Sequence, residues 1–329
     1  MNKTERIRAA LRGEAPDRPP YGFWTHMPGI DLDPERLAVE TAAFAARYDL
    51  DFIKSMPNGF YCVEDWGCEC DYSDIAHGGA ARVVRSAVSL PEDWARLTRL
   101  DVTQGAFGRE LQHLTRLVQL APKDVPVLST AFSPLTIASK LSNGAVHAHR
   151  LTHPDEVFRA LAVITEVTCD FVRATAACGC AGVFFALQDA THQVLDEATY
   201  RAIGEPWDRR VLQAANDAGC WFNTVHLHGE DILFDLVARY DVAALNWHIG
   251  ETSPSIGDYR ATGGTRAILG GLQRGHLTQR DLAAVHADIA RAMTESDGRG
   301  LLLAPPCVIR HPVDEATLRA TATAIKALA

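Results

Sequence analysis

Apolar runs alternate with amphipathic stretches along almost the whole chain. The apolar runs lie at 21–24, 50–56, 125–132, 181–187, 220–228, 241–248, 266–272 and 300–306, and helical patterns lie between them, for example at 154–178, 205–219 and 278–296. This order predicts parallel strands that are joined by helical crossovers. Because the runs are continuously apolar, we expect strands that are buried on both faces. The pattern favours a closed (β/α)8 barrel in a single domain over residues 1–329.

Two long loops interrupt this regular order. The region 57–124 is longer than one strand–helix unit needs, and its first part, at about 57–72, is rich in aromatic and acidic residues, which favours a lid or a hairpin. The second long loop is 251–264. No glycine-rich fingerprint of a dinucleotide-binding fold follows a predicted strand with the required spacing.

The composition is that of a soluble globular protein, with 329 residues of which 47% are hydrophobic and 22% are charged. The net charge of -9 and the absence of any basic run argue against a nucleic-acid-binding protein. The opening residues 1–13 lack the apolar core of a signal peptide, and no apolar stretch reaches the roughly 18 residues of a membrane span. We therefore expect a cytoplasmic protein that does not contact a membrane.

The eight cysteines do not form a recognisable metal or redox motif. Cys68 and Cys70 are separated by one residue, as are Cys178 and Cys180, which is closer than the usual zinc or redox spacing. A reduced set with structural roles is therefore expected. The richness in alanine and arginine indicates a GC-rich bacterial genome, and the sequence leaves the oligomeric state open, a homodimer included.

Metal-binding residues stand at two predicted strand ends, where the functional site of such a barrel lies. His226 and His228 end one strand, and Cys307 follows another. Residues two apart on a strand share a face, so both histidines can point into the barrel mouth. Imidazole and thiolate are preferred ligands of zinc, and three of them leave a fourth position open for catalysis. The alternatives are that the histidines are hydrogen-bonded near the core and that Cys307 is a small apolar filler.

Further polar side chains follow strand ends and are candidates for the pocket wall. His248 is a candidate ligand, a partner of a ligand, or a catalytic or substrate-contacting residue. Asp189 is a candidate catalytic acid that orients a ligating histidine, or else a helix cap. Arg274 would hold a substrate carboxylate or phosphate, or else lie on the surface. The other candidates for substrate binding are Asn58, Gln188 and His192.

Seven stretches spread over the chain form a recognisable set. They are RIRAALRGEAPDRPP (6–20), FSPLTIASKL (132–141), FFALQDA (184–190), YRAIGEPWDRRVLQAA (200–215), HLHGED (226–231), GGLQRGHL (270–277) and LLLAPPCVI (301–309). Together they resemble the uroporphyrinogen decarboxylase superfamily. The resemblance implies a distorted (β/α)8 barrel and either of two activities. One is cofactor-free removal of carboxyl groups from a porphyrinogen, and the other is zinc-dependent methyl transfer between a corrinoid protein and a thiol or a folate.

The chain departs from both branches of this family. The decarboxylases carry an arginine-containing segment and a Ser-Asp pair where this chain has 23–30, without arginine, and 52–59, without an acid. A polycarboxylate substrate needs cationic partners, which argues against a true uroporphyrinogen decarboxylase. The methyltransferases carry His-x-Cys-Gly and a later cysteine, and the matching residues here are His226, His228 and Cys307. The exchange of one thiolate for an imidazole makes a zinc site more positive.

Three hypotheses follow. In the first, Zn²⁺ held by His226, His228 and Cys307 activates a small thiol, and a methyl group passes between this thiol and a corrinoid protein or tetrahydrofolate. The pocket would be lined by Asn58, Gln188, Asp189 and His248, under a loop at about 57–72. The second is a decarboxylase or other lyase in which Arg274 holds the substrate. The third is a non-catalytic corrinoid or metal carrier on the same barrel.

Overall fold

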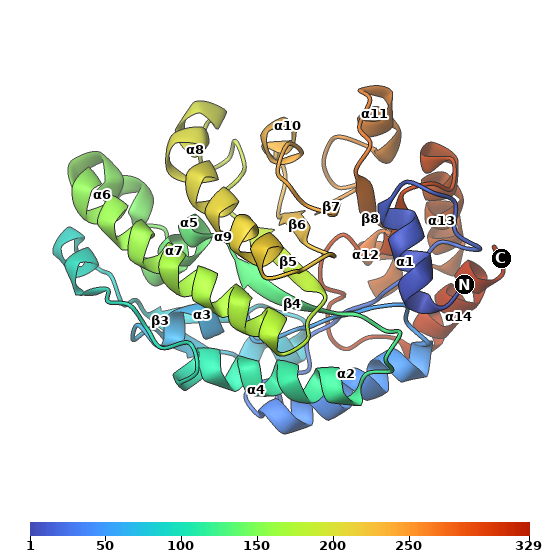
Figure 1. The fold of residues 1–329 in the computed structure, drawn as a ribbon, viewed down its shortest axis with the longest axis horizontal. Coiled ribbons are helices and arrows are strands. Elements are labelled where there is room, and N and C mark those ends of the chain that lie inside the picture. The colour runs from blue at the N-terminus through green and yellow to red at the C-terminus, as the bar shows by residue number, and fades with distance from the viewer.

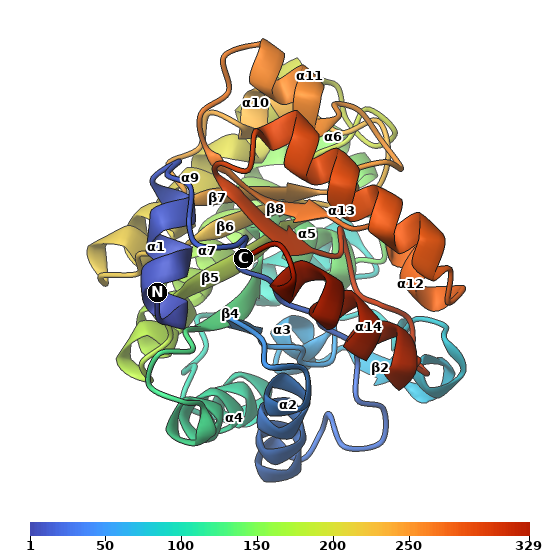
Figure 2. The ribbon, with the colours of Figure 1, turned by 90° about the vertical axis from the view of Figure 1, so that its right-hand side faces the viewer.

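Seven parallel strands form one curled sheet in the computed structural model, which describes residues 1–329. The strands, in their order across the sheet, are β1 (Ile53–Lys54), β4 (Val127–Phe132), β5 (Gly182–Leu187), β6 (Thr224–Leu227), β7 (Ala244–Trp247), β8 (Ala267–Gly271) and β9 (Leu301–Ala304). Helices surround this sheet on its outer face (Figures 1 and 2). The predicted α/β architecture, a distorted barrel, is confirmed.

An extended segment closes the barrel in place of an eighth full strand. Tyr21 forms a parallel bridge with Leu303 of β9, and the Leu303 N–H donates to the carbonyl of Pro20 at 2.8 Å. On the other side, the Asp51 N–H donates to the Tyr21 carbonyl at 3.0 Å, next to β1. The strand predicted at 21–24 is thus reduced to isolated bridges, one at Tyr21 and one just after the predicted strand, between Thr25 and Ile309.

Fourteen α-helices connect and cover the strands. They are α1 (Lys3–Leu11), α2 (Pro34–Tyr48), α3 (Tyr61–Glu64), α4 (Gly105–Leu120), α5 (Pro134–Leu141), α6 (Val146–Thr152), α7 (Pro154–Ala177), α8 (Glu197–Ile203), α9 (Glu205–Asp217), α10 (Phe234–Val237), α11 (Ile256–Ala261), α12 (Arg274–Thr278), α13 (Leu282–Ser296) and α14 (Glu315–Lys326), with two short 3₁₀ helices at Ser73–His77 and Pro91–Arg96. None of these helices is long and apolar enough to cross a membrane.

The helices predicted from the sequence are present, with one shifted start. The patterns at 154–178 and 205–219 correspond to α7 and α9. The pattern at 278–296 becomes α13, which starts only at Leu282. Arg280 adopts a left-handed φ of 62°, which ends the preceding turn, and the Asp281 side chain then accepts from the N–H of Ala284 as an N-cap.

Apolar side chains inside the barrel form a layer beneath the mouth. This cluster joins Phe184, Phe222 and Leu302 of the barrel wall to Ile7 and Ala10 of α1. Helix α1 packs against β9 and therefore covers the barrel at the end where the strands begin, as Figure 2 shows on its left side. A second and larger apolar cluster fills the shell between the sheet and the outer helices.

Buried ion pairs fix the opening segment of the chain to the barrel. The Asp51 side chain is fully buried and accepts from Arg6 Nη1 at 2.8 Å and from Arg18 Nη1 at 2.6 Å. Its second oxygen also accepts the backbone N–H of Tyr21 at 2.9 Å. Because a buried carboxylate is costly without partners, this network holds the closing segment in place.

The aromatic and acidic stretch after β1 forms a small hairpin, as the sequence suggested. Strand β2 (Glu69–Asp71) pairs antiparallel with β3 (Arg82–Arg85). The connection between these two strands, at 75–81, reaches the barrel mouth, where the Arg310 guanidinium donates to the carbonyl of Gly78. The part of the loop that covers the mouth thus extends beyond the predicted 57–72.

Candidate metal centre

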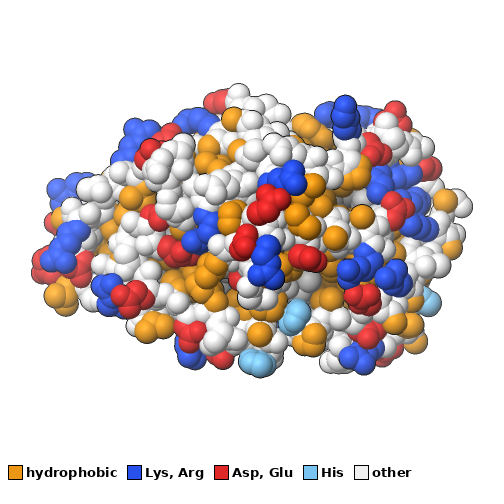
Figure 3. Space-filling view, turned by 90° about the horizontal axis from the view of Figure 1, so that it is seen from below, with side chains coloured by type: hydrophobic (Ala, Val, Ile, Leu, Met, Phe, Trp, Pro, Cys, Tyr) orange, Lys and Arg blue, Asp and Glu red, His pale blue; other side chains and the backbone are white.

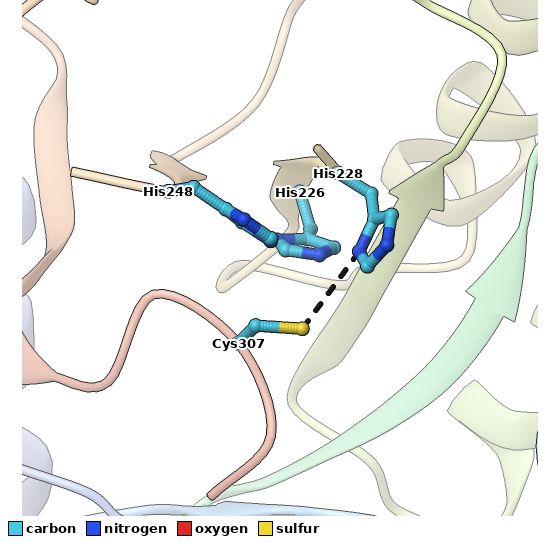
Figure 4. Close-up of side chains that lie close together, drawn as sticks. All are labelled: His226, His228, His248 and Cys307. Atoms are coloured by element: carbon cyan, nitrogen blue, oxygen red, sulfur yellow. Dashed lines mark hydrogen bonds between the residues drawn. The ribbon is translucent and has the colours of Figure 1, made fainter. Parts of the chain in front are cut away.

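Four side chains with metal-binding atoms converge at the mouth of the barrel (Figure 4). His226 and His228 stand at the end of β6, His248 follows β7, and Cys307 lies in the loop after β9. One ligand atom from each of these residues lies within 4.8 Å of every other. The three residues expected to act together from the sequence are therefore close in space, and His248 joins them.

The register of the parallel strands explains this convergence. His226 lies beside Ala186 of β5 on one side and Asn246 of β7 on the other. Successive side chains alternate between the faces of a strand, so the residues two positions later, His228 and His248, point to the same side. The imidazole rings of His228 and His248 are 4.9 Å apart between centroids.

The distance between the ligand atoms of Cys307 and His228 is close to that expected in a tetrahedral zinc site. Zinc bonds of about 2.3 Å to sulfur and 2.05 Å to nitrogen place the two ligand atoms about 3.6 Å apart in a tetrahedron. The Cys307 Sγ lies 3.7 Å from His228 Nδ1. The Nε2 atom of His248 is buried and has no hydrogen-bond partner. A buried nitrogen without a partner beside a thiol indicates that the site takes a further group there, either an ion or a substrate atom.

The electrostatics of the cluster favour a thiolate beside the neutral imidazole of His226 and the protonated imidazole of His248. Burial alone would raise the pKa of the Cys307 thiol, but the surrounding imidazoles of His226, His228 and His248 bring it well below its ordinary value. Burial lowers the pKa of His226 to about 4, so this ring is neutral at pH 7. Burial would also lower the pKa of His248, but contacts with Cys307 and Glu251 raise it to about 9. A thiolate and neutral imidazole nitrogen are the forms that bind metal.

Asn246 holds the ring of His226 in one orientation. The Nδ1 atom of His226 lies 2.5 Å from Asn246 Oδ1, and Asn246 Nδ2 donates to the carbonyl of Leu269 at 2.6 Å. Since the amide nitrogen is already used as a donor, the amide oxygen must accept, and His226 carries its proton on Nδ1. The other nitrogen, Nε2, is left as the ligand atom.

A carboxylate supports His248 in a similar way. The His248 Nδ1 lies 3.1 Å from Glu251 Oε2. Arg274 donates to both oxygens of Glu251, at 3.0 and 2.9 Å. In many metal sites a carboxylate accepts a hydrogen bond from a histidine that binds the metal, because the carboxylate fixes the tautomer and raises the basicity of the ring.

These groups lie at the wall of a cavity of about 420 Å³, a size that suits a small molecule. Its wall is formed by residues from the strand ends, from the loop after β1 and from the segments 75–81 and 307–311. The lining residues are Trp24, His26, Lys54, Met56, Pro57, Gly59, Phe60, Ile75, Gly79, Ala80, Ala81, Thr130, Phe132, Lys140, Phe184, Ala186, Gln188, His226, His228, Arg274, Cys307, Val308, Arg310 and His311. The wall therefore contains several cationic or potentially cationic side chains and no aspartate or glutamate.

The residues predicted to line the pocket divide into two groups. Gln188 and Arg274 are part of the cavity wall. Asn58 is buried instead in a turn, where its Oδ1 accepts the N–H of Phe60 at 3.1 Å. Asp189 faces α6, with its Oδ1 2.8 Å from His147 Nε2. His192 is exposed and lies outside the cavity wall.

The sequence did not single out Asn246 or the two lysines of the cavity. Lys54 is only 7% exposed, and its ammonium lies 4.8 Å from the centre of the Phe184 ring. Burial lowers the pKa of Lys54 to about 7. Glu110 of α4 does not contact Lys54 and raises the pKa of Lys54 only through its charge. Burial raises the pKa of Glu110 itself to about 8. The strand alternation that placed His226 inside could also have placed Lys54 inside, since both lie on inward positions.

Comparisons with known proteins agree with the fold. A family model described as "Uroporphyrinogen decarboxylase (URO-D)" matches residues 2–328. A solved structure of a methyltransferase from Methanosarcina mazei superimposes with a TM-score of 0.85 at 18% identity, over 99% of both chains. A B12-independent methionine synthase from Shewanella sp. W3-18-1 superimposes with a TM-score of 0.61 at 11% identity, over 94% of this chain and 92% of that chain. A putative B12-independent methionine synthase from Listeria monocytogenes has a TM-score of 0.58 at 13% identity, over 94% of this chain and 96% of that chain. No curated protein matches the sequence. At these identities the structures show the shared fold.

Proposed function

We propose that this chain, which belongs to the uroporphyrinogen decarboxylase family, is a zinc-dependent methyltransferase. It would move a methyl group between a small thiol and a corrinoid protein or tetrahydrofolate. The observation that carries the proposal is the convergence of His226, His228, His248 and Cys307 on one side of the cavity. The family membership and the methyltransferase fold of the Methanosarcina mazei protein support a methyl-transfer activity in general terms.

Each side chain of the cluster has a role in this proposal. His226, His228 and Cys307 would hold Zn²⁺, which supplies a Lewis acid that makes a bound thiol acidic. The bound thiol would release its proton to solvent, and His248, which Glu251 holds at Nδ1, would donate from Nε2 to the thiolate sulfur. The bond from the donor to the methyl group breaks, and a bond from sulfur to the methyl group forms. Gln188 and Arg274 would contact the substrate, and the aromatic residues of the wall exclude water.

The first experiment measures the metal content of protein purified without an affinity tag. Wild type is expected to hold about one zinc per chain, and Cys307→Ala and His228→Ala to lose it. Cys178→Ala is a matched control, because this partly exposed cysteine lies on the outer side of the barrel, at the end of α7. Zinc-loaded protein is then assayed for methyl transfer from methyl-corrinoid or methyl-tetrahydrofolate to thiols. Wild type that takes up no metal when zinc is supplied would remove the basis of the proposal.

A carboxy-lyase is the second candidate function, and the cationic cavity wall favours it. Decarboxylation needs a carboxylate to be bound by cationic side chains, and Lys54 and Lys140 line the cavity without an ion pair, whereas Arg274 of the wall is already paired with Glu251. Release of CO₂ from small organic acids or from a porphyrinogen by metal-free protein would establish this activity. The Cys307→Ala variant separates the two functions, because only the zinc-dependent reaction requires the thiolate.

A further inference from the structure

Lys54 is a buried amine at the end of a barrel strand. It is the last residue of β1, and its side chain is almost fully buried. The side chain nevertheless forms part of the cavity wall, so a small molecule inside the cavity can reach it. In barrels of this kind the reactive side chains stand where the strands end. Lys54 therefore occupies a position from which a side chain can act on a bound molecule.

No acidic side chain pairs with Lys54. The only hydrogen-bond partner of its Nζ is Met56 Sδ, at 2.7 Å, and the centre of the Phe184 ring lies 4.8 Å away. Removal from water without a counter-ion disfavours the ammonium form, so burial lowers the pKa of Lys54 to about 7. A large share of this side chain is then a neutral amine at pH 7, and the neutral amine is the nucleophilic form of lysine.

The other lysines of the chain are placed differently. The chain has only five lysines, of which Lys3 and Lys326 each form an ion pair with a carboxylate and Lys123 is exposed. Lys140, the second lysine of the cavity wall, is less buried than Lys54 and lies on helix α5. On the outer face shown in Figure 3, acidic and basic side chains lie intermixed. An unpaired and buried amine at a strand end is thus particular to Lys54.

Three titratable groups act on Lys54 through their charge, each from a different part of the chain. They are His26 of the segment before α2, Glu110 of α4 and Cys307 of the loop after β9. Burial lowers the pKa of His26 to about 4, so this ring is neutral, and it raises the pKa of Glu110 to about 8, so the charge of Glu110 appears only above that pH. The Cys307 thiolate favours the ammonium form, and a metal ion beside it would offset this charge.

The surroundings of Lys54 also suit the product of a reaction with a carbonyl group. The face of the Phe184 ring attracts a cation, so it would stabilise a protonated imine as it does the ammonium. Trp24 and Met56 of the same wall are apolar, and a site that excludes water protects an imine from hydrolysis. The Nδ1 atom of His26, also of this wall, is buried and has no hydrogen-bond partner. It can hold a proton while water is lost.

We propose that Lys54 is a reactive amine that forms an imine with a small aldehyde, an activity separate from methyl transfer. The Lys54 nitrogen adds to the carbonyl carbon, and a proton from the nitrogen passes to the carbonyl oxygen. The bond from carbon to oxygen then breaks, and this oxygen leaves as water with the second proton of the amine. A double bond from nitrogen to carbon remains, and no oxidant or reductant is consumed. The reaction needs neither a metal nor a methyl donor, so it is independent of the proposed function.

Reductive trapping on the full chain tests this proposal. The protein is incubated at pH 7 with propionaldehyde and sodium cyanoborohydride, which converts an imine into a stable secondary amine. Peptide mapping by mass spectrometry then compares all five lysines in one sample and resolves the terminal amine of Met1 separately. Lys54 is expected to be labelled about tenfold or more faster than the exposed Lys123, because an ordinary lysine is almost entirely protonated at this pH. In urea, which unfolds the chain, the five lysines are expected to react at similar rates.

Variants and the unfolded chain decide the outcome. Lys54→Met is expected to lose the rapid label and to keep the slow labels on the other four lysines. Lys123→Met is the matched control and is expected to leave the rate at Lys54 unchanged, because Lys123 lies outside the cavity wall. Labelling of Lys54 no faster than Lys123 in folded wild type overturns the proposal without any variant. An advantage of Lys54 that persists in urea also overturns it, since the cavity would then not be its cause. Protein that takes up no zinc refutes the proposed function and leaves this comparison unchanged.

Discussion

The contact between Asn246 and His226 gives a sharp test of how the metal centre is built. Asn246→Ala removes an acceptor 2.5 Å from His226 Nδ1 and a donor 2.6 Å from the carbonyl of Leu269, both in the interior. The imidazole can then rotate and change tautomer. Loss of such a supporting group usually lowers metal affinity about 10- to 100-fold, which corresponds to about 1.4–2.7 kcal/mol.

The assay is competition for zinc with a chelator of known affinity, measured on folded protein. Asn246→Asp keeps an acceptor for His226 and is expected to retain zinc affinity within about threefold. Asn223→Ala is the matched control, because Asn223 is an equally buried asparagine just before β6, where it accepts from the N–H of Val183 at 3.0 Å. Its loss is expected to lower stability but not zinc affinity. Wild-type affinity in Asn246→Ala, or an equal loss in Asn223→Ala, would refute the argument.

Three further predictions concern stability. Asp51→Ala leaves two arginines without their buried partner and is expected to lower the free energy of unfolding in urea by about 3–5 kcal/mol. A loss below about 1 kcal/mol would mean that the arginines find other acceptors and that Asp51 does not hold the closing segment. Gly182→Ala would place a Cβ 2.4 Å from the backbone of Phe222 and is expected to lower the melting temperature through a loss of about 1–3 kcal/mol, whereas Gly275→Ala meets open space and should be neutral or stabilising. Burial raises the pKa of Asp208 to about 7 from the ordinary value of 3.8. Folding then favours the protonated acid, so its contribution to stability is complete below about pH 4 and is lost as the pH rises to about 7. Relative to wild type, Asp208→Asn should therefore gain stability over this window, by at most about 1.4 kcal/mol per pH unit. A stability difference in urea unfolding that is the same at pH 5 and pH 7 contradicts this linkage.

The barrel and the convergence of His226, His228 and Cys307 could be predicted because they depend on local patterns. Continuous apolar runs mark parallel strands whatever their partners are. The spacing of His226 and His228 on one strand fixes their common direction, and the position of Cys307 after another strand places it at the same rim. The segment at 21–24 was expected as a strand, but it pairs with β9 and the loop after it only through isolated bridges, which the apolar pattern alone does not reveal.

The supporting residues could not be predicted, because their role depends on neighbours that are distant in the sequence. Asn246 looks like an isolated polar residue in an apolar run, and only the parallel register beside His226 gives it a function. Asp189 was expected in the pocket because it follows a strand. In the structure its carboxylate is turned away from the cavity by its contact with His147 of α6. Whether a polar side chain faces the site or a helix is decided by tertiary packing.

Helix α1 also determines how molecules reach the candidate metal centre. Ile7 and Ala10 close the barrel at the end where the strands begin, so the cavity has its mouth only at the opposite end. A substrate and its product must then use the same passage, and one must leave before the next can enter. Turnover would be subject to competitive product inhibition, and a bulky donor that docks over the mouth would trap whatever small molecule is already inside.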